Sequence, residues 1–337
     1  RSKKKNMNVL LTGGAGFIGS HMAAKLLENS MSFIVVDNLS NSNKSQLKKL
    51  EDHFLKKIPF YNFDIRDKNK MAIVFNENQI DAVIHFAGLK SVNESVNNPL
   101  RYYNNNVEGS RNLLSLVKEN NIKRFIFSSS ATVYGEPKYL PIDEDHPLSA
   151  MSPYGQNKID IENSIFNDTF FKKDCSTKIL RYFNPVGAFQ DGLIGEIPRG
   201  IPNNLMPYLL GVVNNIYPFL QIFGDDYKTI DGTPVRDYIH IMDLIDAHYH
   251  ALVDNKLGIE VFNVGTGEGC SVMELIKSFE HINEIKIPYK MLPRREGDVE
   301  TCYADNKKIF KRLGWKSKRD IYQICSDAYK FSQNINR

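Results

Sequence analysis

The sequence predicts an α/β fold built on a doubly wound parallel sheet, followed by a smaller, mixed C-terminal domain. Short apolar runs alternate with segments of helical periodicity through the first half of the chain. This alternation is typical of parallel strands connected by covering helices. Several of the runs are apolar on both faces, as strands buried between two helix layers are. A glycine-rich turn between the first run and the first helical segment supports the same fold class.

The expected elements follow from these patterns in chain order. Strands are predicted at residues 8–12, 33–37, 60–64, 82–87, 125–130 and 179–183, and helical periodicity is clearest at residues 18–27 and 107–117. Glycines and prolines in residues 185–207 predict loops and one short helix. Beyond them, strands are predicted at residues 220–223, 238–241 and 261–264, with a helix at residues 242–252.

These elements predict two domains in the 337-residue chain. Residues 1–6 are expected to be a flexible tail, residues 7–184 the first domain and residues 185–337 the second, with segments near 238–265 returning to the first. The second domain is expected to bind the substrate.

Composition argues against several classes of function. With 42% hydrophobic and 24% charged residues, the chain has the profile of an ordinary globular protein. The net charge of +4 is small, and the run from Lys3 to Lys5 is typical of a solvated tail, so nucleic-acid binding is not expected. No apolar stretch approaches the ~20 residues of a membrane span. The four cysteines are far apart in sequence, which predicts neither a metal site nor a disulfide framework and favours a cytoplasmic protein.

The glycine-rich turn predicts a dinucleotide site. Gly13 permits a sharp turn, Gly16 lets a pyrophosphate approach the backbone at a helix N-terminus, and Gly19 permits close packing of helix on strand. Together with the preceding strand and the following helix, this spacing indicates a Rossmann-type sheet. Asp37 ends the second strand about twenty residues later, where a carboxylate accepts a hydrogen bond from a ribose 2′-hydroxyl and repels a 2′-phosphate. The predicted cofactor is therefore NAD.

A second group of residues predicts chemistry on an alcohol. Ser152 and Pro153 are expected to cap and begin a helix, on which Tyr154 and Lys158 share one face. A phenol that acts as a base at neutral pH needs its pKa lowered by about three units, roughly 4 kcal/mol. The Lys158 ammonium, the helix N-terminus and a nicotinamide cation all favour the phenolate. Ser130, the last of three serines ending the fifth expected strand, is placed to bond a substrate hydroxyl.

With these motifs, the chain resembles the extended short-chain dehydrogenase/reductases and, within them, the UDP-galactose 4-epimerases. The resemblance runs from Thr12 to about Asp305, through the segments TGGAGFIGSH, FAGLKSV, YYNNNV, FSSSATVYGEP, SPYGQNK, RYFNPVGA, GIPNNLMPY, IFGDDY, DGTPVRDYIHIMDL and LPRREGD. It implies an isomerase that interconverts UDP-glucose and UDP-galactose in galactose metabolism. It also implies a cytoplasmic homodimer.

The resemblance also implies roles for individual residues. Ser130, Tyr154 and Lys158 would be catalytic, and the first two would meet the C4 hydroxyl of the sugar. Besides the three glycines, NAD would be held by Phe17, Ile18, Asp37, Asn38, Asp64, Ile65, Phe86, Ala87, Lys90, Asn105, Lys158 and Phe183. UDP would be held by Asn184, Asn204, Leu205, Gln221, Phe223, Arg236, Arg295 and Asp298. The guanidinium groups of Arg236 and Arg295 suit diphosphate oxygens.

Cys302 is the residue that predicts substrate range. In the family that the chain resembles, this position lines the sugar pocket near C2, where a bulky Tyr favours unsubstituted hexoses and a small residue admits N-acetyl sugars. A close-packed pocket needs freed volume to take up an acetamido group. UDP-N-acetylglucosamine and UDP-N-acetylgalactosamine are therefore expected to be interconverted as well. The other interpretation of Cys302 is a small buried hydrophobic residue.

Two alternative functions remain open from the sequence. A nucleotide-sugar 4,6-dehydratase or decarboxylase would share the fold, but a dehydratase has acidic residues after the strand-five hydroxyls, where this chain has Ala131 and Thr132. A catalytically silent NAD-binding protein would not need Ser130, Tyr154 and Lys158 together. His85, in an apolar strand, is expected to be a core histidine.

Overall fold

A computed structural model of the chain describes residues 7–295 and 297–335, and the tail expected at residues 1–6 lies outside this part. The described residues form two compact units. Unit 1 holds residues 7–133, 150–181 and 248–262. Unit 2 holds residues 134–149, 182–247, 263–295 and 297–335.

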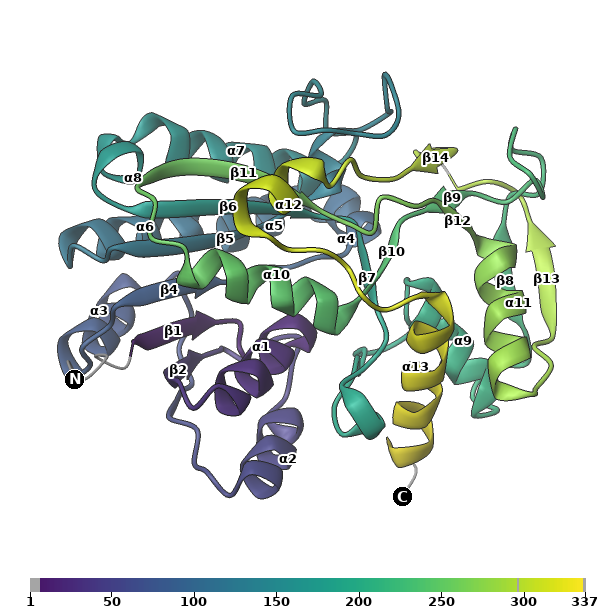
Figure 1. The fold of residues 1–337 in the computed structure, drawn as a ribbon, viewed down its shortest axis with the longest axis horizontal. Coiled ribbons are helices and arrows are strands. Elements are labelled where there is room, and N and C mark those ends of the chain that lie inside the picture. Colours follow the sequence, from purple (N-terminus) through teal and green to yellow (C-terminus); the bar gives the residue numbers. More distant parts are fainter. Residues whose placement is uncertain (1–6, 296, 336–337) are drawn as a thin grey trace. The chain divides into compact units, whose positions relative to one another are not determined.

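Unit 1 is organised by a seven-stranded sheet with the order β11-β6-β5-β4-β1-β2-β3 (Figure 1). The strands are β1 (Asn8–Thr12), β2 (Ser32–Val36), β3 (Phe60–Tyr61), β4 (Ala82–His85), β5 (Arg124–Ser130), β6 (Ser176–Tyr182) and β11 (Gly258–Val264). Pairing is parallel from β3 through β2, β1 and β4 to β5, so the carboxyl ends of these strands share one edge. The predicted Rossmann-type doubly wound sheet is confirmed.

Helices connect the strands of unit 1. They are α1 (Phe17–Glu28), α2 (Ser45–Phe54), α3 (Lys68–Glu77), α4 (Val92–Asn97), α5 (Pro99–Tyr102), α6 (Gly109–Glu119), α7 (Pro153–Asn167) and α8 (Thr169–Lys173), and α10 (Ile241–Val253) ends in this unit. A π-helix (Tyr103–Glu108) links α5 to α6, and a 3-10 helix (Ala131–Val133) follows β5.

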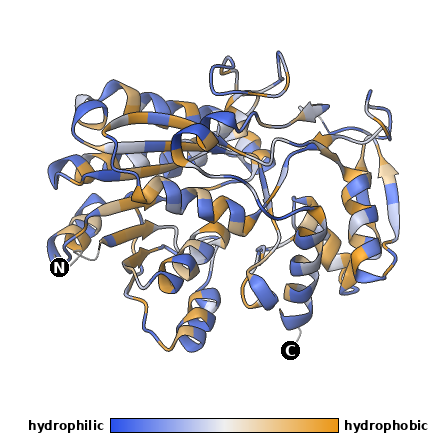
Figure 2. Cartoon of the chain, viewed as in Figure 1, coloured by the Kyte–Doolittle hydropathy of each residue, from blue (hydrophilic) through white to orange (hydrophobic). Residues whose placement is uncertain are grey.

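Successive strand residues point to opposite faces of the sheet. Both faces are buried. Leu10, Val83 and Phe125 join a core cluster with residues of α3, α6 and α7. Their strand neighbours Leu11 and Ile84 are also fully buried, and a Cβ at Gly14, in the turn before α1, would lie 3.3 Å from the Leu11 Cβ. Figure 2 shows the strands as largely hydrophobic and the helices as mixed. This two-sided burial explains the continuous apolar runs in the sequence.

Unit 2 contains short sheets and helices. Its strands are β7 (Asn184–Val186), β8 (Leu220–Phe223), β9 (Val235–Arg236), β10 (Tyr238–His240), β12 (Cys270–Ser271), β13 (Tyr289–Leu292) and β14 (Thr301–Cys302). Its helices are α9 (Leu205–Val213), α11 (Val272–Asn283), α12 (Lys307–Leu313) and α13 (Ile321–Ile335), with the start of α10 and a 3-10 helix (Gln190–Gly192). Leu209, Ile222, Ile276 and Phe279 lie in its core.

Several expected strands differ from the structure at their ends. The run predicted at residues 60–64 forms a strand only over Phe60–Tyr61, because the Asp64 side chain accepts a hydrogen bond from the Arg66 N–H and begins a turn. The strand predicted at residues 82–87 ends at His85, and Ala87 lies in the following loop. The strand predicted at residues 261–264 begins earlier, at Gly258.

Candidate active site

The glycine turn between β1 and α1 has the shape that a bound pyrophosphate requires. Gly13 adopts a φ of +72°, and a Cβ there would lie 2.6 Å from the Ala87 nitrogen. At Gly19 a Cβ would lie 2.3 Å from the Gly13 carbonyl oxygen, so helix and turn touch through backbone atoms. Gly16 is the N-cap of α1 and has no side chain that could accept from the first-turn N–H groups. The first turn of α1, which includes Phe17 and Ile18, thus presents donors suited to an anion.

Asp37 follows β2, directly beside this turn. Its carboxylate accepts hydrogen bonds from the Ala15 N–H at 3.0 Å, the Leu39 N–H at 2.8 Å and the Ser42 hydroxyl at 2.8 Å. These contacts hold the carboxylate against the glycine turn, where a cofactor ribose would lie next to the pyrophosphate. Four lone-pair positions are available on a carboxylate, so one acceptor position remains for a ribose hydroxyl.

The next candidates along the chain are Asn38, Asp64 and Ile65. The Asn38 side chain donates to Asp64 at 2.8 Å. Hydrogen bonds from Arg66 hold the pKa of Asp64 at about 2, so its carboxylate is charged at neutral pH. Ile65 is buried and meets Gly109 at the start of α6.

The loop after β4 brings further candidates toward the glycine turn. Phe86 and Ala87 follow His85, and the Lys90 ammonium lies 6.0 Å from the centre of the Phe17 ring. Asn105, on the π-helix, donates to Asn106 at 3.0 Å.

Asn106 is a residue that the sequence reasoning missed. Its buried amide accepts from the Leu89 N–H at 2.8 Å and donates to the Leu89 carbonyl at 3.0 Å, which fixes the backbone next to Lys90. The π-helix aims this amide at the loop, and π-helical turns often occur at functional sites. The run of three asparagines in YYNNNV was the available signal.

The catalytic candidates lie at the carboxyl edge of the sheet. Ser152 caps α7 by accepting from the Gly155 N–H at 3.1 Å, and Pro153 is the first helical residue, as predicted. Lys158 donates to the Ser128 carbonyl oxygen at 2.6 Å, and its ammonium lies 5.7 Å from the centre of the Tyr154 ring. Ser130 forms a hydrogen bond with the Tyr154 phenol. The structure therefore brings Ser130, Tyr154 and Lys158 together.

The electrostatics of this cluster differ from the expectation in one respect. Burial raises the pKa of Tyr154 to about 12, although the hydrogen bond from Ser130 acts to lower it. Burial also lowers the pKa of Lys158 to about 8, while the charge of Glu162 acts to raise it. Without a ligand, the phenol is therefore neutral, because desolvation destabilises the phenolate more than the hydrogen bond from Ser130 stabilises it.

His85 is a core histidine, as predicted. Its ring nitrogens lie 2.7 Å from the Thr12 hydroxyl and 2.8 Å from the Ser110 hydroxyl. Burial, with a smaller effect of the nearby Lys158 charge, lowers its pKa to about 3, so the ring is neutral.

In unit 2, the two arginines among the candidates for UDP binding each contact another candidate residue. Arg236 on β9 forms an ion pair with Asp298 and lies opposite Cys302, its register partner on β14. The guanidinium of Arg295 lies 3.8 Å from the centre of the Phe223 ring, a stacking contact that orients it.

The remaining candidates of unit 2 lie on its strands and helix ends. Gln221 is on β8 with Phe223. Asn204 is the N-cap of α9, and Leu205 is its first residue. Asn184 begins β7, where its N–H donates to the Asp237 carbonyl at 2.9 Å. Phe183, a candidate for the cofactor, also lies in unit 2 and is buried.

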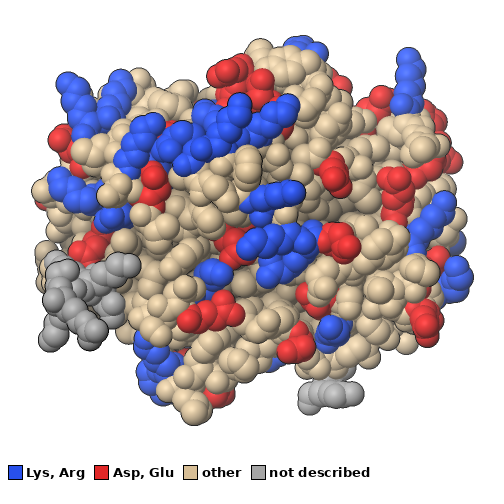
Figure 3. Space-filling model, in the orientation of Figure 1, with Lys and Arg blue, Asp and Glu red and all other residues tan. Residues whose placement is uncertain are grey.

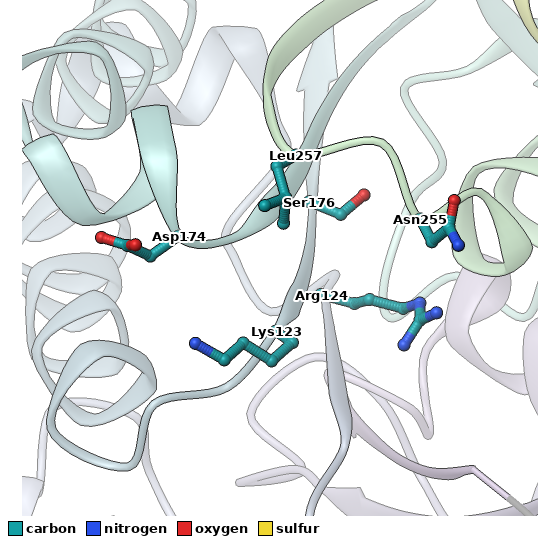
Figure 4. A pocket seen from close by; sticks show the side chains of 6 residues that line it. All are labelled: Lys123, Arg124, Asp174, Ser176, Asn255 and Leu257. Carbon is teal, nitrogen blue, oxygen red and sulfur yellow. The ribbon is translucent and has the colours of Figure 1, made fainter.

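Other features of the described residues indicate no competing site. A pocket at the amino ends of β5 and β6 is lined by Lys123, Arg124, Asp174, Ser176, Asn255 and Leu257, at the edge opposite to the catalytic candidates (Figure 4). The Lys123 and Arg124 side chains point away from each other and do not converge on a ligand. Within residues 7–295 and 297–335, no three His, Cys, Asp or Glu side chains cluster as metal ligands would.

One face of the molecule carries charges of both signs (Figure 3). On the face seen in Figure 3, Lys and Arg side chains occur beside Asp and Glu side chains. No helix in the described part of the chain is long and apolar enough to cross a membrane.

Comparison with known proteins identifies the family. The chain is 46% identical to the UDP-glucose 4-epimerase of Bacillus subtilis, covering 98% of both chains. It is 49% identical to UDP-glucose 4-epimerase 2 of Arabidopsis thaliana, covering 97% of this chain and 95% of the relative. The chain belongs to the UDP-glucose 4-epimerase family.

Solved structures and a broader family profile agree with this assignment. A UDP-glucose 4-epimerase from Stenotrophomonas maltophila, described with bound NAD and formylated UDP-arabinopyranose, superimposes with a TM-score of 0.94 at 43% identity and 98% and 99% coverage. The enzyme from Bifidobacterium longum in complex with NAD+ and UDP also gives 0.94, at 45% identity and 97% and 98% coverage. Residues 10–328 match the profile of the GDP-mannose 4,6 dehydratase family, which includes the rival activity considered above.

Proposed function

We propose that this chain is an NAD-dependent UDP-hexose 4-epimerase that interconverts UDP-glucose and UDP-galactose. The observation that carries the proposal is the cluster of Ser130, Tyr154 and Lys158 at the same sheet edge as the glycine turn. A phenol, a hydroxyl and an ammonium suit proton removal from an alcohol. The close relationship to named epimerases supports the same reaction.

The residues of the cluster have distinct roles in this proposal. Tyr154 removes the proton from the C4 hydroxyl and later returns it. Ser130 orients the same hydroxyl, and Lys158, held by the Ser128 carbonyl, supplies a positive charge near the phenol. NAD held by the glycine turn and Asp37 would supply the hydride acceptor and donor for C4, so the sugar would pass through a 4-keto form and the net redox change would be zero.

The cofactor is proposed to bind in unit 1 on residues that fit it. The glycine turn and the first turn of α1 take the pyrophosphate, and Asp37 takes a ribose hydroxyl. The set in unit 1 is completed by Asn38, Asp64, Ile65, Phe86, Ala87, Lys90 and Asn105. Phe183, a residue of unit 2, is the remaining candidate for the cofactor. The domain of residues 7–184 is thus proposed as the NAD-binding domain, with segments of 238–265 returning to it.

UDP is proposed to bind in the second domain, residues 185–337. Arg236 and Arg295 suit the diphosphate because guanidinium groups form paired hydrogen bonds with its oxygens. Each is already oriented, one by Asp298 and the other by Phe223. Asn184, Asn204, Leu205 and Gln221 are proposed to complete this site. We further propose that the enzyme is a cytoplasmic homodimer that acts in galactose metabolism.

The test is an assay of the purified protein with UDP-galactose and, separately, with UDP-N-acetylglucosamine. Conversion to UDP-glucose supports the epimerase, whereas release of water with formation of a 4-keto-6-deoxy sugar would show the dehydratase instead. Interconversion of the N-acetyl sugars is expected because Cys302 is small, and Cys302→Tyr is expected to suppress that activity far more than the conversion of UDP-galactose.

A further inference from the structure

A buried ion pair lies on the same helix face as the catalytic pair. Glu162 is on α7, one turn beyond Lys158 and two turns beyond Tyr154, a spacing that aligns all three side chains. Only 1% of Glu162 is exposed, and 3% of Arg181, its partner on β6. Arg181 donates to one carboxylate oxygen through Nε at 3.0 Å and to the other through Nη2 at 2.5 Å.

Glu162 also binds the catalytic end of β5. The Ser129 hydroxyl donates to Glu162 Oε1 at 2.6 Å. Ser129 stands between Ser128, whose carbonyl accepts from Lys158, and Ser130, which bonds Tyr154. The carboxylate therefore holds the middle of a three-residue segment whose two outer members each contact a catalytic side chain.

Among the described residues around Lys158, Glu162 is the one that supplies a negative charge. On β4, His85 is neutral, because burial holds its pKa at about 3. On β5, the Phe127 ring lies 4.9 Å from the ammonium. On α7, the Tyr154 phenol is neutral without a further cation. On β6, Arg181 is itself paired with Glu162. Burial lowers the pKa of Lys158 to about 8, so near neutral pH its charge depends on Glu162.

We propose that Ser129, Glu162 and Arg181 form a positioning triad for the acid–base chemistry, in which Glu162 keeps Lys158 charged and fixes the Ser128–Ser130 segment. The ion pair is also costly to bury, since two charges lose their hydration. The two hydrogen bonds of Glu162 with Arg181 and one from Ser129 offset part of that cost, and its negative charge lies where the reaction needs an ammonium. This inference rests on the proposed epimerase function, because it assigns the triad to the proton transfer of Tyr154.

The test is Glu162→Gln, which keeps the shape and removes the charge. Lys158 then loses its proton at lower pH, so the alkaline limb of the pH dependence of kcat should move to lower pH, by about one unit or more. At pH 8, kcat should fall at least about fivefold while the KM for UDP-galactose changes less than about twofold. A direct readout is the tyrosinate absorbance of the NAD-loaded protein minus that of Tyr154→Phe, whose midpoint should move to higher pH in the Glu162→Gln background.

Two further variants separate positioning from stability. Glu162→Gln leaves the Arg181 charge buried without its partner, so the double variant Glu162→Gln/Arg181→Met removes both charges and is expected to fold. It should still show the shifted pH profile. The matched control is Glu260→Gln, which weakens another buried ion pair of β6, where Lys178 lies 2.9 Å from both Glu260 and Asp254. It should lower the free energy of unfolding without moving the profile.

The outcomes decide the two proposals separately. The triad is overturned if the profile and the tyrosinate midpoint of Glu162→Gln coincide with those of the wild-type chain, or if Glu260→Gln moves them equally. If the wild-type protein converts no UDP-hexose, the proposed function fails, while the tyrosinate titration still decides whether Glu162 governs the charge next to Tyr154.

Discussion

Tyr154 combines a favourable position with an unfavourable environment for a base. Its phenol bonds Ser130 and faces the Lys158 side chain, yet burial raises its pKa to about 12. Deprotonation at neutral pH therefore needs further positive charge beside the ring, and a nicotinamide cation has the right sign. Such an arrangement ties proton removal to the presence of the oxidised cofactor, because without it the phenol stays neutral.

At the scale of this residue, Tyr154→Phe is expected to lower turnover of UDP-galactose by at least ~100-fold, the low end of a general-base contribution. The ring that packs in the site remains, so thermal stability and NAD content should be unchanged. Initial rates, a melting curve and cofactor analysis measure the three quantities. Near-normal turnover in a folded, NAD-loaded variant would rule out Tyr154 as the base.

Asp37 is expected to determine the choice between NAD and NADP. Because its carboxylate accepts three hydrogen bonds, Asp37→Asn is a milder change than Asp37→Gly. Removing the negative charge should narrow the difference between the Kd values for NAD and NADP, mainly by improving NADP binding. Titration of the stripped protein with each cofactor measures this. Recovery of NADP from the purified wild-type protein would contradict the assignment.

In the turn between β1 and α1, one glycine is needed for packing and another for ligand binding. A methyl group at Gly19 would overlap the Gly13 carbonyl oxygen at 2.3 Å, whereas one at Gly16 would lie 3.3 Å from the same atom. Gly19→Ala should therefore lower the free energy of unfolding by about 1–3 kcal/mol, as overpacking does, and also lose NAD.

Gly16→Ala serves as the matched variant in the same turn. It should keep most of the stability but weaken NAD binding, since its methyl group would occupy the space of the pyrophosphate. Urea unfolding and cofactor titration of both variants provide the comparison. Equal effects of the two variants on stability would refute this division of roles.

At the scale of the whole molecule, the proposed NAD and UDP residues fall largely into different units. Hydrogen exchange should therefore respond differently to the two ligands. NAD should protect the backbone around residues 13–19 and 86–90 in unit 1. UDP alone should protect residues 204–223 and 297–302 in unit 2. Protection of the glycine turn by UDP alone, at a level equal to that caused by NAD, would contradict the assignment of the two sites.

The elements that depend on local patterns could be predicted from the amino-acid sequence. The strands at residues 8–12 and 220–223 agree with the structure, and Ser152 and Pro153 begin α7 as expected. Apolar periodicity and capping chemistry act over a few residues, so they can be recognised without knowledge of the fold. The same holds for the spacing of Tyr154 and Lys158, which one turn of helix brings together.

The environment of those residues depends on contacts made in the folded chain. Ser129 on β5 and Arg181 on β6 meet Glu162 on α7, and Asn106 reaches Leu89 from a π-helix. The raised pKa of Tyr154 likewise results from burial by the surrounding chain. Burial and charge are properties of neighbours that lie far apart in sequence. The proposed catalytic side chains could therefore be selected from local patterns, while the groups that affect their charge could not.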